Sequence, residues 1–197
     1  MKGDLESVME LIDNGTDINK QIRDDDQRTP LHWASSSKNS ALVAGYTPLM
    51  CAVSAGREKN VALLLGANAD VNMENENGET VLHMTKDRSD ILILFIDRVA
   101  DINKKVGYRY VRDIKDCYGL TVLMKCASRG CTESIQLLLD RGADMSIQDE
   151  NGNTAAHYAA FDNQREAYVM LLHNGYDEST VNKESKTALD YVHSVVS

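Results

Sequence analysis

The stretch LLLDRGADMSIQDENGNTAAHYAA, residues 137–160, decides the fold that we expect. Its leucines belong to a helical segment that ends before Gly142, and a second helical segment begins after Thr154. A threonine at a helix start caps free backbone N–H groups, which stabilises the helix by about 1 kcal/mol. A glycine after a helix supplies the left-handed C-cap. The stretch therefore predicts a helix, a hairpin and a further helix.

The phrase that starts with this threonine recurs along the chain, at Thr29, Thr47, Thr80, Thr121, Thr154 and Thr187. The steps between these threonines are eighteen, thirty-three, forty-one, thirty-three and thirty-three positions. A period of about 33 with T-P-L-H near the start and LL-x-x-G-A-D near the end resembles the ankyrin repeat, a β-turn followed by two antiparallel helices. We therefore expect an all-α ankyrin-repeat solenoid of about seven repeats, with helix-turn-helix units and β-hairpin fingers.

The repeats are expected to form a single ankyrin-repeat domain over residues 1–197. We expect the first repeat to be without its first helix, because the sequence starts inside the turn of that repeat. The expected boundaries are 1–23 (partial), 24–43 (partial), 44–74, 75–115 with an enlarged finger, 116–148, 149–181 and 182–197.

The same register predicts which side chains pack between repeats. The leucine two positions after each threonine should face inward. A small residue three positions further along should lie where neighbouring helices approach closely. The second helix of a repeat should end at a glycine or an asparagine. The inward leucines are Leu31, Leu49, Leu82, Leu123 and Leu189, the small residues are Ala34, Ala52, Cys126 and Ala159, and the helix-ending residues are Gly15, Asn68, Gly142 and Gly175.

The short step between Thr29 and Thr47 breaks the period. It falls fifteen positions short of the regular step, and this shortfall corresponds to most of one second helix and the next hairpin. Because a repeat contacts only its neighbours, losing half of one would expose apolar surface on both sides. The simplest interpretation is that residues of the parent protein are missing between Val43 and Ala44, so that no peptide bond joins these two. A true deletion is the alternative.

The long step between Thr80 and Thr121 enlarges one finger. Val99 occupies the position that ends the second helix, and it follows Thr80 two positions sooner than in the regular repeats. We therefore expect a shorter turn between the helices of this repeat. The finger then gains ten residues, and five basic residues against one acidic residue give segment 104–115 a charge of +4. Its alternating pattern predicts an extended hairpin.

Composition narrows the class of partner. A net charge of −9 and a pI near 5.0 disfavour binding to nucleic-acid phosphates or to an anionic membrane. Cys51, Cys117, Cys126 and Cys131 form no CxxC pair, which is typical of a reducing compartment. The sequence shows no signal-peptide pattern and no apolar run long enough to cross a membrane. We expect a monomer in the cytoplasm and nucleus.

The histidines invite a metal or general-base interpretation. His32, His83 and His157 each occupy the fourth position of the threonine phrase, on different repeats. At that position a histidine can hydrogen-bond within its own turn and to the next repeat, so we interpret all three as structural. The sequence has no Gly-rich phosphate loop and no GxSxG phrase. We therefore expect a protein that is not an enzyme and holds no cofactor or metal.

We therefore look for the functional site on the exposed surface of the repeats. Fingertips and the exposed sides of first helices should line a concave groove that binds a protein. Aromatic anchors beside acidic groups suit a partly basic protein partner. The alternative is that these residues are ordinary solvent-exposed surface without a binding role. The candidate residues are Asp25, Asp26, Arg28, Trp33, Tyr46, Glu76, Asn77, Glu79, Tyr118, Leu120, Glu150, Asn151, Asn153 and Phe161.

Several phrases, in their order, resemble the gankyrin family of ankyrin-repeat chaperones, which act in assembly of the proteasome regulatory particle. Seven repeats are also that family's number, and the resemblance covers the whole chain. Ankyrin proteins in general share parts of these phrases, such as TPLH and GNT. The resemblance to the gankyrin family therefore rests on the combination of the phrases and their order. The phrases are DDDQRTPLHWA at 24–34, AGYTPLM at 44–50, SAGREKNVALLLG at 54–66, SIQDENGNTAAH at 146–157 and NKESKTAL at 182–189.

The resemblance implies that the groove binds the C-terminal domain of one AAA ATPase subunit of the proteasome. Arg28 and Trp33 match groove residues of the family, and Tyr46 matches an aromatic position. Lys86 corresponds to a basic contact residue. Mammalian members also carry an L-x-C-x-E phrase associated with retinoblastoma-protein binding. The corresponding segment 158–163 reads YAAFDN, so that partnership is not carried over.

Two other functions fit the same architecture. An inhibitor of the I-kappa-B type, which masks a transcription factor with an acidic ankyrin groove, would share this charge. A free-standing adaptor or a pathogen effector would share it as well. Identifying the proteins that bind the chain would separate these functions from an ATPase chaperone.

Overall fold

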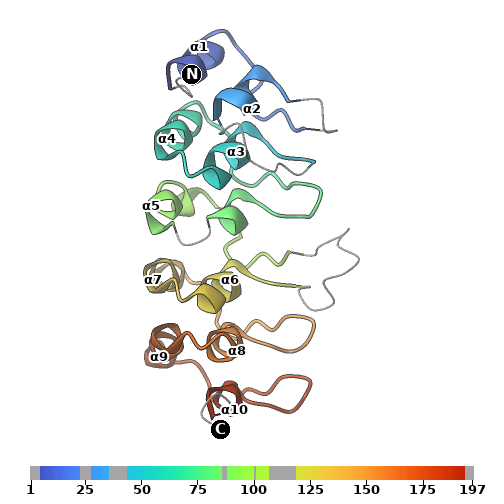
Figure 1. Ribbon diagram of the computed structural model, residues 1–197, viewed down its shortest axis with the longest axis vertical. Coiled ribbons are helices and arrows are strands. Elements are labelled where there is room, and N and C mark those ends of the chain that lie inside the picture. Colours follow the sequence, from blue (N-terminus) through green and yellow to red (C-terminus); the bar gives the residue numbers. More distant parts are fainter. Residues whose placement is uncertain are drawn as a thin grey trace. The chain divides into compact units, whose positions relative to one another are not determined.

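The computed structural model describes residues 5–22, 28–35, 44–85, 88–99, 101–106 and 119–193 (Figure 1). The chain divides into an N-terminal unit, Met1–Ala100, and a C-terminal unit, Asp101–Ser197. Helices of the N-terminal unit are α1 (Leu5–Asp13), α2 (Pro30–Ser35), α3 (Pro48–Ser54), α4 (Glu58–Gly66), α5 (Ser89–Leu92) and the 3-10 helices η1 (Val81–Met84) and η2 (Ile96–Arg98). Those of the C-terminal unit are α6 (Val122–Arg129), α7 (Thr132–Asp140), α8 (Ala155–Phe161), α9 (Arg165–His173) and α10 (Ala188–His193).

One local arrangement starts every first helix of the described residues. The side chain three positions after each threonine turns back and accepts a hydrogen bond from the threonine main-chain N–H, as in a capping box. The acceptor is the histidine Nδ1 in three repeats, the methionine sulfur in two and a carboxylate in one. The distances are 3.2 Å for His32 and His157, 3.3 Å for His83, 3.4 Å for Met50 and Met124, and 2.8 Å for Asp190.

In the N-terminal unit the first helices α2 and α3 and the turn η1 form one layer, and α1, α4 and α5 form a second layer (Figure 1). α3 packs against α2, α4 and η1. Leu49 and Met50 of α3 are fully buried at the centre of these contacts. The layers match the helix-turn-helix units that the sequence predicts.

The short step of the period lies between α2 and α3. No described helix lies there, and α1 packs against both α2 and α4. Asn60 of α4 donates from Nδ2 to the carbonyl oxygen of Ala34, at 3.3 Å, so a later repeat satisfies the end of α2. Val8 of α1 is fully buried, whereas Met9 is 47% exposed. The predicted break before Ala44 involves Val43, which lies outside the described residues.

The repeat that starts at Thr80 departs from the expected helix, turn and helix. Its first helix is only the 3-10 turn η1, and its second helix is divided into α5 and η2. The second helix begins nine positions after Thr80, against eleven positions in the repeats that start at Thr47, Thr121 and Thr154, as a turn two residues shorter predicts. Thr85 Oγ1 donates to the carbonyl oxygen of Leu82 at 3.0 Å, which ends the first helical turn early. Phe95, 1% exposed, still fills the core.

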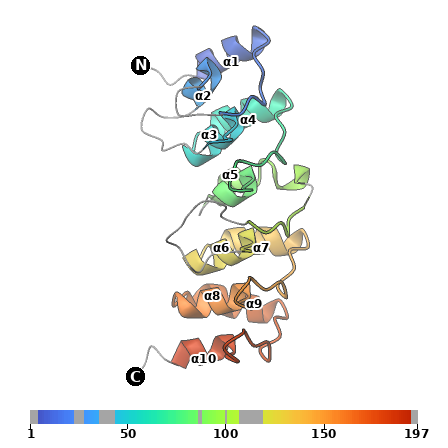
Figure 2. The same cartoon turned by 90° about the vertical axis from the view of Figure 1, so that its right-hand side faces the viewer.

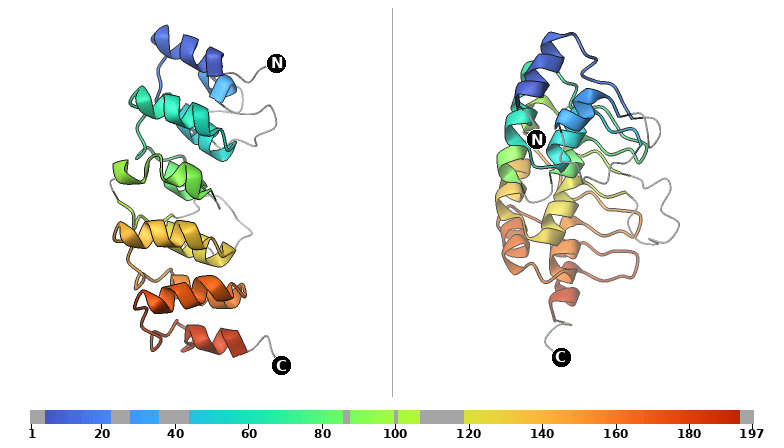
Figure 3. Two further views of the ribbon diagram at one scale, coloured as in Figure 1. Left: turned by 90° about the vertical axis from the view of Figure 1, so that its left-hand side faces the viewer. Right: turned by 45° about the horizontal axis from the view of Figure 1, so that its top comes forward.

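In the C-terminal unit, α8 lies between α6 and α10 in the layer of first helices. α7 packs against α6 and α9, and α9 packs against α8 (Figure 3). Ala156 and Ala159 of α8 are fully buried, and these small side chains allow the neighbouring first helices to approach closely. The predicted packing of leucine and small residues is therefore present in this unit.

Hairpin fingers project to the right of the first helices of each unit in Figure 1 and point toward the viewer in Figure 2. Asp149 N–H donates to the carbonyl oxygen of Asn153, and Asn182 N–H donates to that of Lys186, both at 2.9 Å. Neighbouring fingers are joined, because Lys183 N–H donates to the Asn151 carbonyl oxygen at 2.9 Å. The fingers therefore carry main-chain hydrogen bonds both within a repeat and between repeats.

The enlarged finger is described only at its base. Val106 N–H donates to the carbonyl oxygen of Leu120 at 3.0 Å, and Gly119 N–H donates to that of Val106 at 2.9 Å. Residues 107–118, on which the prediction of an extended hairpin rests, lie outside the described residues. β structure in the described part consists of this bridge and one between Val181 and Thr187.

Most of the packing predictions are confirmed. Four of the five leucines are buried, and positive φ angles of 73°, 64°, 83° and 90° confirm Gly15, Asn68, Gly142 and Gly175 as left-handed positions. Ala34 is only half-buried. The prediction for Leu189 was wrong, because its side chain is 41% exposed. Leu189 belongs to α10, and within the described part no later helix packs on that side.

Candidate functional site

A groove in the C-terminal unit is the main candidate site. It lies between the first helices α6, α8 and α10 and the two fingers that precede α8 and α10, and its volume is about 650 Å³. The groove is lined by Leu120, Met124, Lys125, Ser128, Arg129, Asn151, Asn153, His157, Tyr158, Phe161, Asp162, Asn182, Lys183, Glu184 and Tyr191. We call it the C-terminal groove.

Aromatic side chains are prominent in its lining. Phe161, at the end of α8, is 68% exposed. Its ring meets that of Tyr191 of α10 edge-on, with centroids 5.7 Å apart and an interplanar angle of 75°. Tyr191 also lies 6.3 Å from His157, edge-on, and Lys186 Nζ lies 5.3 Å from its ring centroid. The exposed Phe161 ring is therefore held by a neighbouring repeat.

The fingers orient the two tyrosines of the groove. Tyr158 Oη donates to Asp149 Oδ2 at 2.6 Å, and Asn182 Nδ2 donates to Tyr191 Oη at 2.9 Å. Asp149 is buried and its other oxygen accepts from the main-chain N–H of Asn153 at 2.7 Å. Each tyrosine is thus fixed to the finger of its own repeat, so the apolar surface is ordered before any ligand binds.

His157 links the groove to the next finger. Its Nδ1 accepts from Thr154 N–H at 3.2 Å, which leaves the proton on Nε2, and Nε2 lies 3.1 Å from the Lys186 carbonyl oxygen. His32 makes the same pair of contacts with Thr29 and the carbonyl oxygen of Tyr46. Burial lowers the pKa of both histidines. The expected hydrogen bonds, within the turn and to the next repeat, are confirmed for these two.

Charge in the C-terminal groove differs from the charge of the whole chain. Its lining has three cations, Lys125, Arg129 and Lys183, and two carboxylates, Asp162 and Glu184, so its formal charge is 3 − 2 = +1. The chain as a whole carries −9. Glu184 pairs with Lys186 at 3.0 Å, and Asp162 accepts from the Ser128 hydroxyl. The lining is thus not the acidic surface that we expected.

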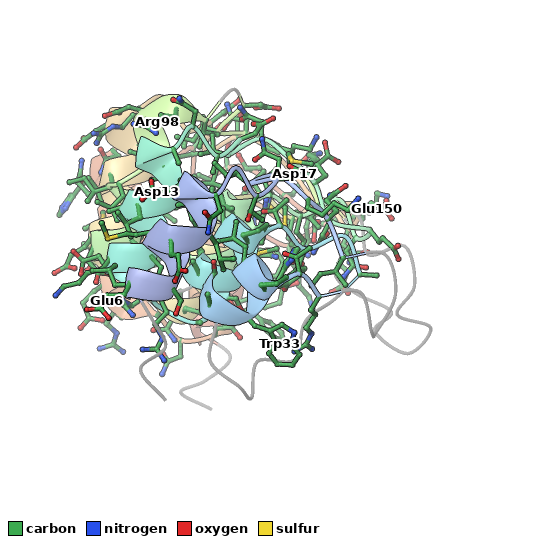
Figure 4. The ribbon with its side chains drawn as sticks, turned by 90° about the horizontal axis from the view of Figure 1, so that it is seen from above. Glu6, Asp13, Asp17, Trp33, Arg98 and Glu150 are labelled. Carbon is green, nitrogen blue, oxygen red and sulfur yellow. The ribbon has the colours of Figure 1, made fainter. Side chains whose placement is uncertain are left out.

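A second exposed aromatic lies in the N-terminal unit. Trp33 of α2 is 50% exposed and its side chain projects away from the ribbon (Figure 4). The Arg28 guanidinium lies 4.6 Å from the centre of the Trp33 ring, within the range of a cation–π interaction. Two predicted site residues are therefore brought together in one surface feature.

The other predicted site residues divide by burial. Glu76, Glu150, Asn151 and Phe161 are exposed, and Asn77, Glu79 and Asn153 are half-buried. Tyr46 and Leu120 were expected on the open surface, and that expectation was wrong, because they are only 7% and 8% exposed. Each directly precedes the threonine that caps a first helix, at the base of a finger. The remaining candidates, Asp25, Asp26, Lys86 and Tyr118, lie outside the described residues.

Several lining residues were missed from the sequence, and five of them supply positive charge or aromatic surface. Three of these share one register, because Lys125, Tyr158 and Tyr191 each stand four positions after a threonine of the repeated phrase, as Trp33 does. That register could have identified them. The other two, Arg129 and Lys183, carried no signal of their own, since single basic residues occur throughout the chain.

Cys51 is buried. Burial raises the pKa of the Cys51 thiol to about 12, so this cysteine stays protonated and unreactive near neutral pH. Within the described ranges no three His, Cys, Asp or Glu side chains are grouped so that they could hold a metal ion. The helices described here are all too short or too polar to cross a bilayer.

Comparison with known families matches most of the chain to ankyrin repeats. The family described as "Ankyrin repeats (3 copies)" matches residues 106–184. The family "Ankyrin repeats (many copies)" matches residues 1–44, and "Ankyrin repeat" matches residues 44–76.

Individual relatives are distant and longer. The palmitoyltransferase AKR1 of Lachancea kluyveri is 27% identical over 98% of this chain, which spans 28% of that protein. The human neurogenic locus notch homolog protein 1 is 28% identical over 81% of the chain and 6% of its own length. An ankyrin repeat protein of Acanthamoeba polyphaga mimivirus is 26% identical over 77% of this chain, which spans 37% of that protein. The chain thus spans well under half of each of these proteins.

Proposed function

Since the chain belongs to the ankyrin-repeat family, whose repeats serve as scaffolds for protein–protein interaction, we propose that it binds a protein partner through the C-terminal groove. The ordered aromatic surface of this groove carries the proposal. Phe161 is 68% exposed and is braced by Tyr191, which Asn182 in turn holds. Exposed aromatic side chains that are fixed before binding are typical anchors of protein interfaces.

We further propose the Arg28–Trp33 pair as a second contact surface, independent of the C-terminal groove. The pair joins a cation to a half-exposed aromatic ring, and arginine and tryptophan are the residues most often found at the energetic centre of interfaces. Glu76, which is exposed on a finger of the same unit, provides acidic surface for the same partner.

The finer proposal is a chaperone of proteasome regulatory-particle assembly, with the C-terminal domain of an AAA ATPase subunit as the partner. It rests on the sequence phrases that resemble gankyrin, and on Arg28 and Trp33 within the phrase RTPLHW. An adaptor, or an inhibitor of the I-kappa-B type, is the alternative. The acidic composition of the chain favours this alternative, because such inhibitors mask basic surfaces.

We also propose that the chain acts as a monomer in the cytoplasm and nucleus and is itself not an enzyme. The histidines support the last point, since both ring nitrogens of His32 and His157 are engaged in structural hydrogen bonds. Neither ring has a nitrogen left for proton transfer to a substrate.

Affinity capture followed by mass spectrometry tests the proposal. The intact chain serves as bait beside two variants, Phe161→Ser and Trp33→Ala, whose side chains are at least half exposed. We expect one set of proteins to be captured by the intact chain and lost with Phe161→Ser. AAA ATPase subunits in that set support the chaperone, and a transcription factor supports the inhibitor. Equal capture by the intact chain and both variants contradicts binding through either surface.

A further inference from the structure

We propose that the C-terminal groove takes an acidic peptide segment, in which a carboxylate side chain stands close to a large apolar side chain. This inference rests on the proposed function and deepens it by naming the chemistry of the partner. It reverses the expectation of a basic partner for this part of the chain.

The first argument is the placement of the cations. Arg129 lies at the end of α6, and Phe161 lies at the end of α8. The hydrogen bond from Ser128 to Asp162 joins these two helix ends, and Arg129 and Phe161 both line the groove. A ligand that covers Phe161 therefore comes within reach of a positive charge.

The second argument is the state of the acidic groups. Lys186 pairs with Glu184 at 3.0 Å, which offsets the charge of that carboxylate within the protein. Asp162 already accepts the Ser128 hydroxyl, and buried Asp149 accepts from Tyr158. Each of these carboxylates already has a partner. Arg129 and Lys183 are both exposed, and among the described residues neither forms a salt bridge.

The third argument is the distribution of charge over the chain. An overall charge of −9 repels acidic segments from most of the surface, whereas the lining of the groove is +1. An acidic segment is therefore favoured at the groove and disfavoured elsewhere, which is how charge gives an interface its selectivity. The exposed face of Phe161 supplies the apolar contact that such a segment needs for affinity.

Selection from a phage library of short random peptides tests this chemistry. The full chain is the bait, and the expected result is enrichment of peptides with Asp or Glu within a few residues of Phe, Trp, Leu or Met. A synthetic peptide of the most enriched sequence is then measured by fluorescence anisotropy. The double variant Arg129→Glu with Lys183→Glu should weaken its binding about tenfold or more, and added salt should weaken binding to the unmodified chain.

A matched control separates a local effect from overall charge. Lys59→Glu with Arg165→Glu changes the net charge by the same amount at exposed positions outside the groove, on α4 and α9. This control should bind the peptide as the unmodified chain does. Circular dichroism and thermal unfolding of both double variants show whether each is folded.

Three results would overturn the inference. Enrichment of basic or uncharged peptides contradicts the acidic partner while leaving the proposed binding function intact. An equal loss of affinity in the control variant assigns the effect to net charge and contradicts the groove as its source. If no peptide is enriched by the full chain, the inference of a peptide ligand is contradicted, whereas the proposed binding function is decided separately by the affinity capture.

Discussion

The imidazole of His157 and the main-chain carbonyl of Lys186 connect two successive repeats, with Nε2 and the carbonyl oxygen 3.1 Å apart. The same ring accepts the Thr154 N–H that starts α8. One side chain therefore both caps its own helix and holds the finger of the next repeat, so local and inter-repeat stability are coupled at this residue.

Replacing His157 should show the two roles separately. Methionine keeps the helix cap, because Met124 performs that role at the equivalent position, but it loses the bond to Lys186. We expect His157→Met to lower the free energy of unfolding by about 1–2 kcal/mol and His157→Ala to lower it further. Urea denaturation of the full chain measures both. Equal stability of the methionine variant and the unmodified chain would show that the inter-repeat bond contributes nothing.

Stability should decline as the pH falls below about 6.5. Burial lowers the folded-state pKa of His32 and His157 from the ordinary value of 6.5, so below that value the unfolded chain binds more protons than the folded chain. The free energy of unfolding then falls as pH falls from 6.5 toward the lowered pKa. Denaturation at pH 8, 7, 6 and 5.5 measures the slope, which His157→Met should reduce.

Carboxylates affect the stability of the protein at lower pH than the histidines do. Hydrogen bonds from Ser146 and Ser179 hold the pKa of Asp144 and Asp177 below their ordinary value of 3.8. Their contribution is therefore complete above that pH and is lost only as pH falls through the lowered pKa. A decline at pH 6 with an unchanged slope in His157→Met would assign the effect to groups other than His157.

Alanine substitutions at Gly152 and Gly142 separate the cost of backbone strain from the cost of a close contact between fingers. Both have positive φ angles, 80° and 83°. A Cβ on Gly152 would lie 2.9 Å from the Lys183 nitrogen of the next finger, whereas one on Gly142 would meet nothing within 4 Å. We expect Gly142→Ala to cost about 1 kcal/mol through strain and Gly152→Ala to cost clearly more. Thermal unfolding compares them, and equal losses would contradict tight packing between the fingers.

The Arg28–Trp33 pair should matter for binding more than for folding. Arg28→Glu with Trp33→Ala is expected to weaken partner binding by about 2 kcal/mol or more, since anchors of this type often contribute that much each. Trp33 is half exposed, so the free energy of unfolding should change less. Isothermal titration with the captured partner measures the affinity. Unchanged affinity of the folded double variant would place the contact elsewhere.

The enlarged finger should contribute to stability. Lys105 Nζ donates to the Gln148 carbonyl oxygen at 2.6 Å, so the base of this finger already contacts the next one. Trimming residues 105–114 removes this contact and should lower the melting temperature slightly, because exposed charge interactions contribute about 0–1 kcal/mol each. Binding should stay intact. Unchanged stability with weakened, salt-sensitive binding would instead assign the finger to the partner.

Local features of the fold could be predicted from the sequence. The threonine phrase indicated the starts of the first helices, and Leu31, Leu49, Leu82 and Leu123 were assigned to the core. The left-handed positions Gly142 and Asn68 followed from the same register. Each of these depends on residues within one or two repeats, so a single repeat period contains enough information to place them.

The sequence by itself determined the ankyrin repeats, their register and the structural role of His32 and His157. Only the tertiary structure decided that Tyr46 is buried and that the Phe161 ring contacts the Tyr191 ring edge-on. It also decided that Arg129 and Lys183 line one groove. Capping and core packing follow from neighbours in sequence. Exposure and the charge of a groove instead depend on side chains from different repeats, and their distances are set only when the repeats pack together.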